Sequence, residues 1–276
     1  MKILTKINKF YPDRLKKIKN APAQLYVEGN YELLNVDSIA IVGTRKCTSY
    51  GKKYAAKFAK ELSQKGICIV SGLAIGIDTI AHVNSMQEIG KTIAVIGSGF
   101  KHIYPEENAM LSKQILENGG CIVSEYSPEA EMDKANFPQR NRIISGLALG
   151  VLVIEAFYRS GSTITAKYAQ KQGKQVFCIP NRLDETASYS TNLLIQNGAN
   201  LVMQSEDILK YYTEEKQQII PKEYQEIYNL IGQLPISANE ITKQTNKKIS
   251  ETMQTLSMLE LEGYIKSVAG NKYTRI

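Results

Sequence analysis

Six short, apolar, β-branched runs alternate with longer amphipathic stretches between Ser38 and about Val202. These candidate strands are Ser38–Val42, Ile67–Val70, Thr92–Ile96, Cys121–Ser124, Val151–Ile154 and Gln175–Ile179. Continuous hydrophobicity over a few residues is typical of strands that are buried on both faces of a parallel sheet. The alternation therefore predicts an α/β fold, with a doubly wound, Rossmann-like, mostly parallel sheet and helices on both of its faces.

The helical stretches and the chain ends complete the predicted organisation. The helices expected between the strands are Tyr50–Lys65, Ile77–Ile89, Asn108–Asn118, Gln139–Leu149 and Ser162–Gln172. We expect a basic N-terminal extension over residues 1–34, the Rossmann-like domain over 35–212 and a linker over 213–221. Residues 222–276 predict three helices followed by two short strands, which indicates a small C-terminal winged-helix domain. Its elements are Lys222–Ile231, Ala238–Lys243, Ser250–Leu261, Gly263–Val268 and Lys272–Ile276.

Composition and cysteine usage narrow the class of protein. Hydrophobic residues make up 43% of the 276 and charged residues 22%, which is ordinary for a globular protein. No apolar run approaches the roughly 20 residues that cross a bilayer, and the basic N-terminus lacks the apolar core of a secretory signal. The four cysteines form no Cys-x-x-Cys pair. We therefore expect a cytoplasmic protein with no membrane association, no disulfide and no metal site.

The net charge of +7 is unevenly placed. Residues 1–20 hold seven basic side chains and one acidic one. Six basic residues and no acid lie between Arg45 and Lys60, and seven basic residues accompany Glu155 alone between Lys134 and Lys174. Such clusters are either solvated helix faces or contacts for a polyanion, and the position of each cluster in the fold decides between the two.

Loops of small residues follow three of the predicted strands. They begin at Gly43-Thr44-Arg45, at Ser71-Gly72 and at Gly97-Ser98-Gly99. Ligands of open α/β sheets bind beyond the carboxyl ends of the strands, where glycine lets the backbone approach closely and helix N-termini attract anions. These loops permit tight turns in any protein of this fold, but three of them at one edge favour a phosphate-binding rim.

The segment Lys134–Arg142 follows the fourth strand and places Phe137 among Lys134, Arg140 and Arg142. An aromatic ring can stack on an unpaired base, while neighbouring cations bind phosphates. Arg45 reaches the same edge of the sheet from the first strand. We therefore expect single-stranded nucleic acid as the ligand. No predicted helix offers the features of a major-groove reader.

Signals for catalysis are weak. The sequence contains no Gly-x-x-x-x-Gly-Lys-Ser/Thr loop, and Gly97-Ser98-Gly99 is an incomplete dinucleotide fingerprint. His82 and His102 are expected in a helix and a loop, with structural or surface roles. Glu155 is the one acid that points to the crevice, either to orient other groups or to act as a general base. We predict no catalytic residue, no cofactor and no enzymatic activity.

Five ordered motifs resemble the DNA-processing protein A (DprA/Smf) family. They are Val42-Gly43-Thr44-Arg45, Ser71-Gly72-Leu73-Ala74-x-Gly76-Ile77-Asp78, Gly97-Ser98-Gly99, Phe137-Pro138-x-Arg140-Asn141-Arg142 and Glu155-Ala156-x-x-x-Ser160-Gly161-Ser162. The likeness spans about residues 10–212, and the C-terminal module resembles the winged-helix domain of the family. The resemblance implies a cytoplasmic homodimer that binds and protects single-stranded DNA during natural transformation. It also implies loading of the recombinase RecA onto that strand, without catalysis.

The resemblance also implies the site residues. The arginine of the first motif corresponds to Arg45, and the lysine and phenylalanine that hold a phosphate and stack a base correspond to Lys134 and Phe137. The full set expected to bind DNA is Gly43, Thr44, Arg45, Ser71, Gly72, Lys134, Phe137, Arg140, Asn141 and Arg142. The sequence departs from the family in lacking its helical N-terminal domain and in reading Pro180-Asn181 where Pro-Gly is usual.

Two other functions stay open at this point. A nucleotide hydrolase of the lysine-decarboxylase-like (LOG) type has a similar sheet, but its Pro-Gly-Gly-x-Gly-Thr loop would correspond here to Ser160-Gly161-Ser162. An adaptor that recruits proteins through its winged-helix domain is the other possibility. That domain is nearly neutral, so we expect it to contact protein. The dimer interface, the RecA-contacting surface and the natural competence of the source organism cannot be predicted.

Overall fold

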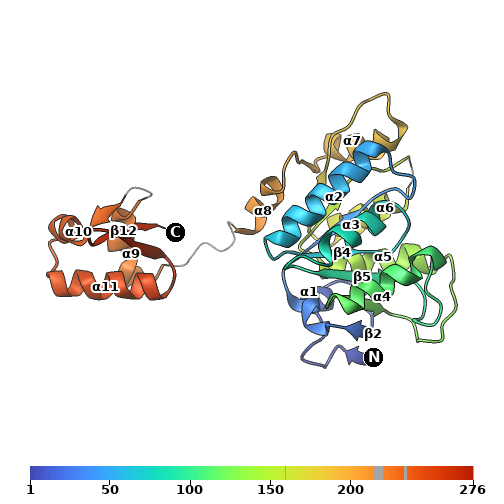
Figure 1. The fold of residues 1–276 in the computed structure, drawn as a ribbon, viewed down its shortest axis with the longest axis horizontal. Helices are drawn as coiled ribbons and strands as arrows, with labels where there is room; N and C mark the ends of the chain where they lie inside the picture. The colour runs from blue at the N-terminus through green and yellow to red at the C-terminus, as the bar shows by residue number, and fades with distance from the viewer. Residues whose placement is uncertain (159, 214–219, 233–234, 276) are drawn as a thin grey trace. The chain divides into compact units, whose positions relative to one another are not determined.

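A computed structural model describes residues 1–158, 160–213, 220–232 and 235–275 of the chain. The chain divides into two compact units, residues 1–210 and 211–276 (Figure 1). A single sheet runs through the larger unit. Its strands, in spatial order, are β1 (Lys2–Thr5), β2 (Gln24–Gly29), β6 (Cys121–Ser124), β5 (Thr92–Ile96), β4 (Cys68–Ser71), β3 (Ser38–Val42), β7 (Gly150–Val153), β8 (Gln175–Cys178) and β9 (Asn200–Leu201).

The strands from β6 to β9 are all parallel, and the chain reverses its direction of travel across the sheet between β3 and β7. The predicted α/β fold with a mostly parallel sheet is confirmed. Strands β3, β5 and β6 have the predicted bounds, and the other three predicted strands differ by a residue at their ends. The reversal between β3 and β7 matters because loops diverge at such a point and leave a crevice above the sheet.

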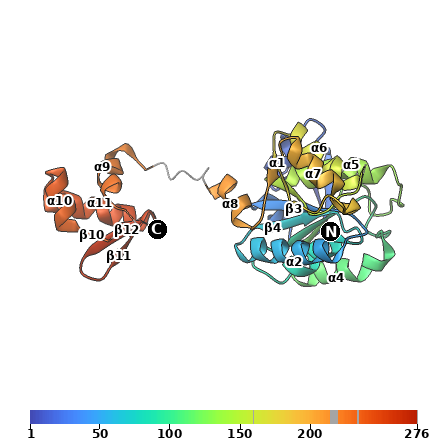
Figure 2. The same ribbon diagram turned by 90° about the horizontal axis from the view of Figure 1, so that it is seen from above.

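Helices cover both faces of the sheet, as Figure 2 shows from above. One face carries α2 (Ser49–Gln64), α3 (Ile77–Ser85) and α4 (Ala109–Glu117), and the other carries α1 (Asp13–Lys16), α5 (Asn136–Leu147) and α6 (Gly161–Lys171). Helices α7 (Tyr189–Gln196) and α8 (Glu206–Thr213) follow β8 and β9. Short 3-10 turns lie at Tyr31–Asn35, Glu106–Asn108 and Thr186–Ser188.

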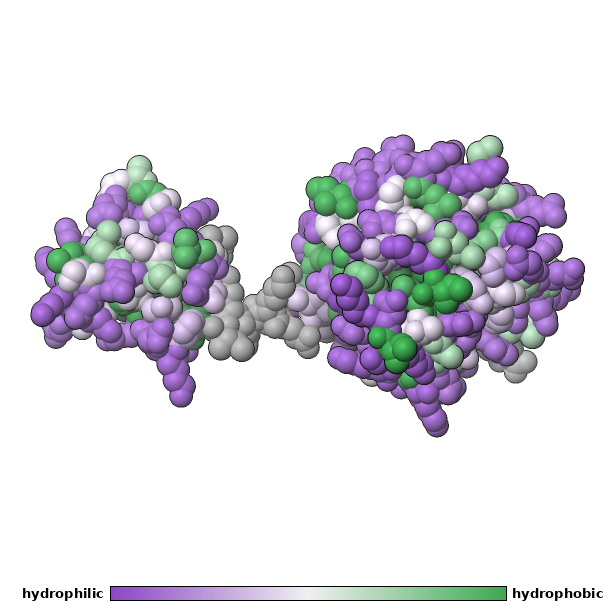
Figure 3. Space-filling model, turned by 90° about the horizontal axis from the view of Figure 1, so that it is seen from below, coloured by the Kyte–Doolittle hydropathy of each residue, from purple (hydrophilic) through white to green (hydrophobic). Residues whose placement is uncertain are grey.

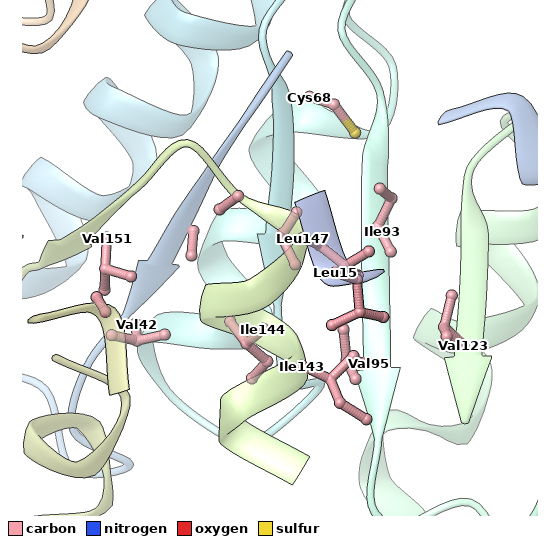
Figure 4. Packing of buried hydrophobic residues seen from close by; sticks show 14 of the residues in the cluster. Leu15, Val42, Cys68, Ile93, Val95, Val123, Ile143, Ile144, Leu147 and Val151 are labelled. Carbon is pink, nitrogen blue, oxygen red and sulfur yellow. The ribbon is translucent and has the colours of Figure 1, made fainter. Parts of the chain in front are cut away.

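The main hydrophobic core lies between the sheet and the helices α1 and α5. Ile143, Ile144 and Leu147 of α5 pack with Leu15 of α1 against strand side chains such as Val95 (Figure 4). All five of these side chains are at most 1% exposed. Burial of apolar side chains on this scale fixes the position of α5, which carries the candidate site at its N-terminal end.

Residues 1–34 differ from the predicted basic extension. Strand β1 pairs antiparallel with β2, and β2 pairs antiparallel with β6, so this segment extends the main sheet. Leu25 and Val27 of β2 are buried, and the Tyr11 hydroxyl donates a hydrogen bond to the Pro22 carbonyl (2.6 Å). The alternation of buried and open residues in Gln24–Gly29 is a strand signal, but the basic composition of residues 1–20 favoured an extension over the whole segment.

The smaller unit has the predicted winged-helix elements. Its helices are α9 (Lys222–Leu230), α10 (Ala238–Thr245) and α11 (Ile249–Leu261), and its strands are β10 (Ile236–Ser237), β11 (Ile265–Val268) and β12 (Lys272–Arg275). Ile227, Ile241, Leu256 and Leu259 belong to its own hydrophobic core. Most of the predicted linker, together with Ile276, lies outside the described residues.

Figure 3 shows the distribution of hydrophobic residues on one face of the surface. The face seen in Figure 3 is mainly hydrophilic and is interrupted by small hydrophobic patches on both units. Among the described helices, none combines the length and the hydrophobicity that a bilayer crossing requires.

Replacing Leu15 with Ala tests whether the N-terminal segment belongs to the core. Leu15 is fully buried, and its Cδ1 would lie 2.5 Å from a Cβ placed on Gly146 of α5. Truncation leaves a cavity, so we expect the free energy of unfolding of the larger unit to fall by about 2–5 kcal/mol in urea, followed by circular dichroism. Ile7→Ala, at a 96% exposed position, is the matched control and should change it by less than about 0.5 kcal/mol. Equal stability of the two variants would contradict integration of residues 1–34.

Candidate functional site

A cleft of about 560 Å³ lies above the carboxyl ends of β3 and β7, where the strand order reverses. Six segments that are distant in the sequence line it: residues 42–46, Ala74 and Asp78 around the start of α3, Tyr104 after β5, the loop and first turns of α5 from Lys134, Phe157 after β7, and the N-terminal part of α6. Of the ten predicted site residues, this lining includes Gly43, Thr44, Arg45, Lys134, Phe137, Arg140 and Asn141. The reversal of strand order thus brings the two basic clusters of the sequence to one opening.

Phe137 lies at the centre of the cationic side of this cleft. Its half-buried ring has the guanidinium carbons of Arg45 and Arg140 each 5.9 Å from its centroid. The Tyr104 ring lies 5.4 Å from it at a tilt of 42°. Lys134 is exposed on the same cleft. We call Arg45, Tyr104, Lys134 and Phe137 the cationic-aromatic cluster.

Tyr104 is a member of this cluster that sequence reasoning missed. It lies in the loop that follows β5 and is 37% exposed. The signal was available, because a tyrosine beyond the carboxyl end of a parallel strand lies at the edge where ligands bind. The glycine-rich start of the same loop, Gly97-Ser98-Gly99, gives the stronger sequence signal, and Tyr104 lies five residues beyond it.

The first loop supplies two exposed cations, Arg45 and Lys46, on a fixed backbone. The Thr44 N–H donates to the Glu155 carbonyl (2.8 Å), and the Thr44 hydroxyl accepts from the Lys46 N–H (3.0 Å). Thr44 is 6% exposed, whereas the Arg45 side chain is exposed. A Cβ on Gly43 would lie 2.5 Å from Ile77 Cγ1, so glycine is required for this close approach. Thr44 and Gly43 therefore shape the loop, and Arg45 faces the solvent.

Arg140 has a different place from the one its sequence position suggested. It is only 4% exposed, and its Nη1 donates to the Gly72 carbonyl (2.6 Å) and to the Val95 carbonyl. Burial lowers the pKa of Arg140 to about 10, which the charge of Asp78 opposes, so the group stays protonated at neutral pH. Arg140 thus ties α5 to the ends of β4 and β5.

Ser71 and Gly72 belong to this buried support and do not line the cleft. The Ser71 hydroxyl is fully buried and donates to the Ile41 carbonyl (2.7 Å). The Gly72 N–H donates to Asp78 Oδ2 (3.1 Å), and a Cβ at this position would lie 2.5 Å from Arg140 Nη1. Burial raises the pKa of Asp78, and the charge of Arg140 opposes that rise. These residues hold the backbone of the rim in place.

Arg142 does not join the cleft, contrary to the sequence prediction. Its Nη2 forms a salt bridge with Glu125 (2.6 Å), and its Nε donates to the Asn20 carbonyl (2.9 Å). The physical reason is the helical period, because residues two apart on α5 point to different sides. Asn141 does line the cleft, where its Nδ2 donates to the Gly161 carbonyl (3.2 Å).

The N-terminus of α6 faces the same cleft through Ser160, Gly161 and Ser162. The two serine hydroxyl oxygens lie 2.6 Å apart, and among the described residues the Ser160 side chain forms no capping hydrogen bond at this helix end. Unpaired N–H groups and the positive end of the helix dipole make such an end suited to a phosphate or carboxylate. These three residues belong to the fifth family motif of the sequence, but they were not among the residues predicted to bind DNA.

Glu155 and His82 are buried supports. The Glu155 carboxylate is 0% exposed and accepts from the Thr48 N–H (2.9 Å) and the Thr48 hydroxyl, at the start of α2. Burial lowers the pKa of His82 to about 3, and its Nδ1 lies 2.8 Å from the Thr92 hydroxyl. Of the two expected roles of Glu155, the structure supports the orienting one. Within the described ranges no three His, Cys, Asp or Glu side chains are grouped to hold a metal ion.

Two different family models match the two units of the chain. Residues 2–213 match the family model of DNA recombination-mediator protein A, and residues 213–271 match the model of the DprA winged helix domain. Protein Smf of Escherichia coli is 36% identical over 286 residues, an alignment that covers 98% of this chain and 76% of that protein. DNA processing protein DprA of Bacillus subtilis is 44% identical over 208 residues, covering 75% of this chain and 70% of the relative.

Solved structures agree with these relatives. DNA processing protein A from Streptococcus pneumoniae superposes with a TM-score of 0.71 at 42% identity, covering 75% of this chain and 73% of that one. The Helicobacter pylori protein of the same name, whose structure concerns its single-stranded DNA binding mode, gives 0.68 at 31% identity, with 78% and 97% covered. These matches do not favour the nucleotide-hydrolase alternative. The chain belongs to the DprA/Smf family of DNA-processing proteins.

Proposed function

We propose that this protein is a cytoplasmic, non-catalytic binder of single-stranded DNA that protects the strand during natural transformation and loads RecA onto it. One observation carries the proposal: the ring of Phe137 lines an open cleft and has the guanidinium carbons of Arg45 and Arg140 each 5.9 Å from its centroid. An aromatic face flanked by cations suits a nucleotide whose base is unpaired.

The form of the cleft favours a single strand over a duplex. In a duplex the faces of the bases are covered by their neighbours, so a ring set into a cleft reaches only an unpaired base. Arg45 and Lys134 are exposed and form no salt bridge with a described residue. They are therefore available to bind phosphates. The open N-terminus of α6 adds a further anion site in the same cleft.

The comparisons support the finer parts of the proposal. The related Helicobacter pylori protein is described by its single-stranded DNA binding mode, and the matching family model is named for mediation of DNA recombination. A mediator holds the strand on which a recombinase assembles, which fits RecA loading. Residues 221–276 carry seven basic and six acidic side chains. We propose that this nearly neutral winged-helix domain contacts protein.

A homodimer is part of the proposal, and the far edge of the sheet supports it. Strand β9 is the last strand of the sheet, and apolar side chains are open around it: Leu183, Tyr189, Leu193, Leu201 and Met203, which are 39–94% exposed. Several of them line a groove of about 490 Å³. Exposed apolar side chains beside an edge strand suit a second copy of the chain.

Substitutions in the cationic-aromatic cluster test the proposed function. Phe137→Ala should weaken binding of a labelled single-stranded oligonucleotide by about 1–3 kcal/mol in fluorescence anisotropy, because a base loses its stacking partner. Phe137→Leu should weaken it similarly, since leucine fills space without offering a ring face. Arg45→Ala should also weaken binding, and the three variants should then load RecA less efficiently.

The control for this series is Lys113→Ala, which removes an exposed cation from α4 on the opposite face of the sheet. It should bind like the unaltered protein. If Arg45→Ala and Phe137→Ala also bind like the unaltered protein, the site is assigned wrongly.

Substitution of Arg140 is expected to lower the stability of the fold, whereas substitution of Arg45 is not. Arg140→Gln leaves the Gly72 and Val95 carbonyls without their buried donor, so the free energy of unfolding should fall by about 2 kcal/mol or more. Arg45→Gln, at an exposed position, should change it by less than about 0.5 kcal/mol. Urea denaturation measures both. A fully stable Arg140→Gln that fails to bind DNA would show that Arg140 is a ligand and not a support.

The proposed dimer predicts a mass of two chains in light scattering. Leu193→Glu combined with Leu201→Glu places charges in the apolar groove and should give a single-chain mass, because a buried unpaired carboxylate is strongly unfavourable. Ile89→Glu, at a 77% exposed position after α3, should leave the dimer intact. A double variant that still has the mass of two chains would place the interface elsewhere.

A further inference from the structure

A second cleft, of about 870 Å³, lies between the N-terminal segment and helices α5 and α6. Three separate parts of the chain meet there: residues 14–20, the middle of α5, and the end of α6 with the turn after it. Its lining contains six cationic side chains: Arg14, Lys17, Lys19, Arg142, Lys171 and Lys174. No acidic side chain of the described residues lines it. We call it the basic cleft.

Three of these cations build the walls. Arg14 pairs with Asp37 and Arg142 pairs with Glu125 (2.6 Å). Lys174 donates from Nζ to the carbonyls of Ser145, Gly146 and Ala148, at 2.6–2.8 Å, and so caps the end of α5. The arginine pairs and the capped helix end fix the position of the cleft relative to α5.

The other three cations are uncompensated. Lys17, Lys19 and Lys171 are exposed, and none forms a salt bridge with a residue that the structure describes. Burial lowers the pKa of Lys174 to about 7, and the charge of Arg14 adds to this shift. The three exposed lysines have no acidic partner among the described residues, so an anion in the cleft would reduce their mutual repulsion.

The packing of α5 against α6 connects the basic cleft with the candidate site. On α5, Asn141 lines the first cleft and Arg142 the second; on α6, Ser162 lines the first and Lys171 the second. The two helices lie side by side in both ribbon views (Figures 1 and 2). Helix α6 has 11 residues, a length of about 16 Å. A few extended nucleotides cover that distance.

We propose that the basic cleft is a second contact for the strand held at the candidate site, and that it binds the phosphate backbone without reading bases. The inference rests on the proposed function. Its lining holds one aromatic side chain, the half-buried Tyr168, and no ring flanked by cations. Mobile lysines spread over an open cleft suit a series of phosphates more than one compact ligand.

The test compares strand lengths in the full chain. Lys17→Gln combined with Lys171→Gln removes two exposed cations from opposite walls. We expect the Kd of a long single strand, of about 25 nucleotides, to rise roughly tenfold, and the slope of log K against log salt to become shallower by about 1.4. The Kd of a strand of about six nucleotides, which occupies the candidate site alone, should stay unchanged.

The matched control is Lys60→Gln combined with Lys113→Gln, which removes the same charge from exposed positions on α2 and α4. Both strand lengths should bind this control like the unaltered protein. If the control binds the long strand as weakly as the basic-cleft variant does, the loss of affinity is a general effect of charge, and the inference is overturned.

The remaining outcomes separate the inference from the proposed function. If the unaltered protein binds both lengths and the basic-cleft variant does the same, the second contact is wrong while the proposed function stands. If the unaltered protein binds neither length, the proposed function fails and the inference fails with it. If inorganic tripolyphosphate binds the unaltered protein and not the variant, while long-strand binding is equal in both, the ligand of the cleft is a free polyphosphate and the inference is overturned.

Discussion

The buried guanidinium of Arg140 connects the parts on which the candidate site depends. It bonds the Gly72 carbonyl after β4 and the Val95 carbonyl of β5, while its own helix carries Phe137 one turn earlier. A charge that is 4% exposed would be costly without such partners. Once it is bonded, however, it fixes α5 relative to two strand ends. The ring of Phe137 therefore has a defined position before any ligand arrives.

Polar residues near the edge of the sheet divide by burial into supports of the backbone and exposed groups. Four of them are at most 7% exposed and form hydrogen bonds with backbone groups or with neighbouring side chains: Thr44, Ser71, Asp78 and Glu155. Arg45 is exposed and keeps its guanidinium open. Buried hydrogen bonds make the rim rigid, and rigid placement of the open cations lowers the entropy lost when a ligand binds. The same division recurs in the basic cleft. Arg142 and Lys174 bond to neighbouring groups and hold its walls, whereas Lys17 and Lys171 are exposed.

Much of the fold could be predicted because its signals are local. The β-branched runs gave six of the seven parallel strands of the central sheet to within a residue, and only the two-residue β9 was missed among them. The three helices and the two longer strands of the winged-helix domain followed from helical periodicity and a hairpin turn. The N-terminal strands β1 and β2 were missed because their basic surroundings were taken as a mark of an extension. For the site, the positions of Arg45 and Phe137 followed from the rule that loops after parallel strands share one edge.

Sequence alone determined which residue types reach the carboxyl edge of the sheet, because strand ends and the loops that follow them are set by local pattern. Only the tertiary structure decided which of those side chains are open. Arg140 and Arg142 are two residues apart and chemically identical, yet one is bonded beneath the rim and the other turns to a second cleft. The helical period points the two side chains in different directions, and packing against distant segments decides their partners. Neither effect can be read from the two positions alone.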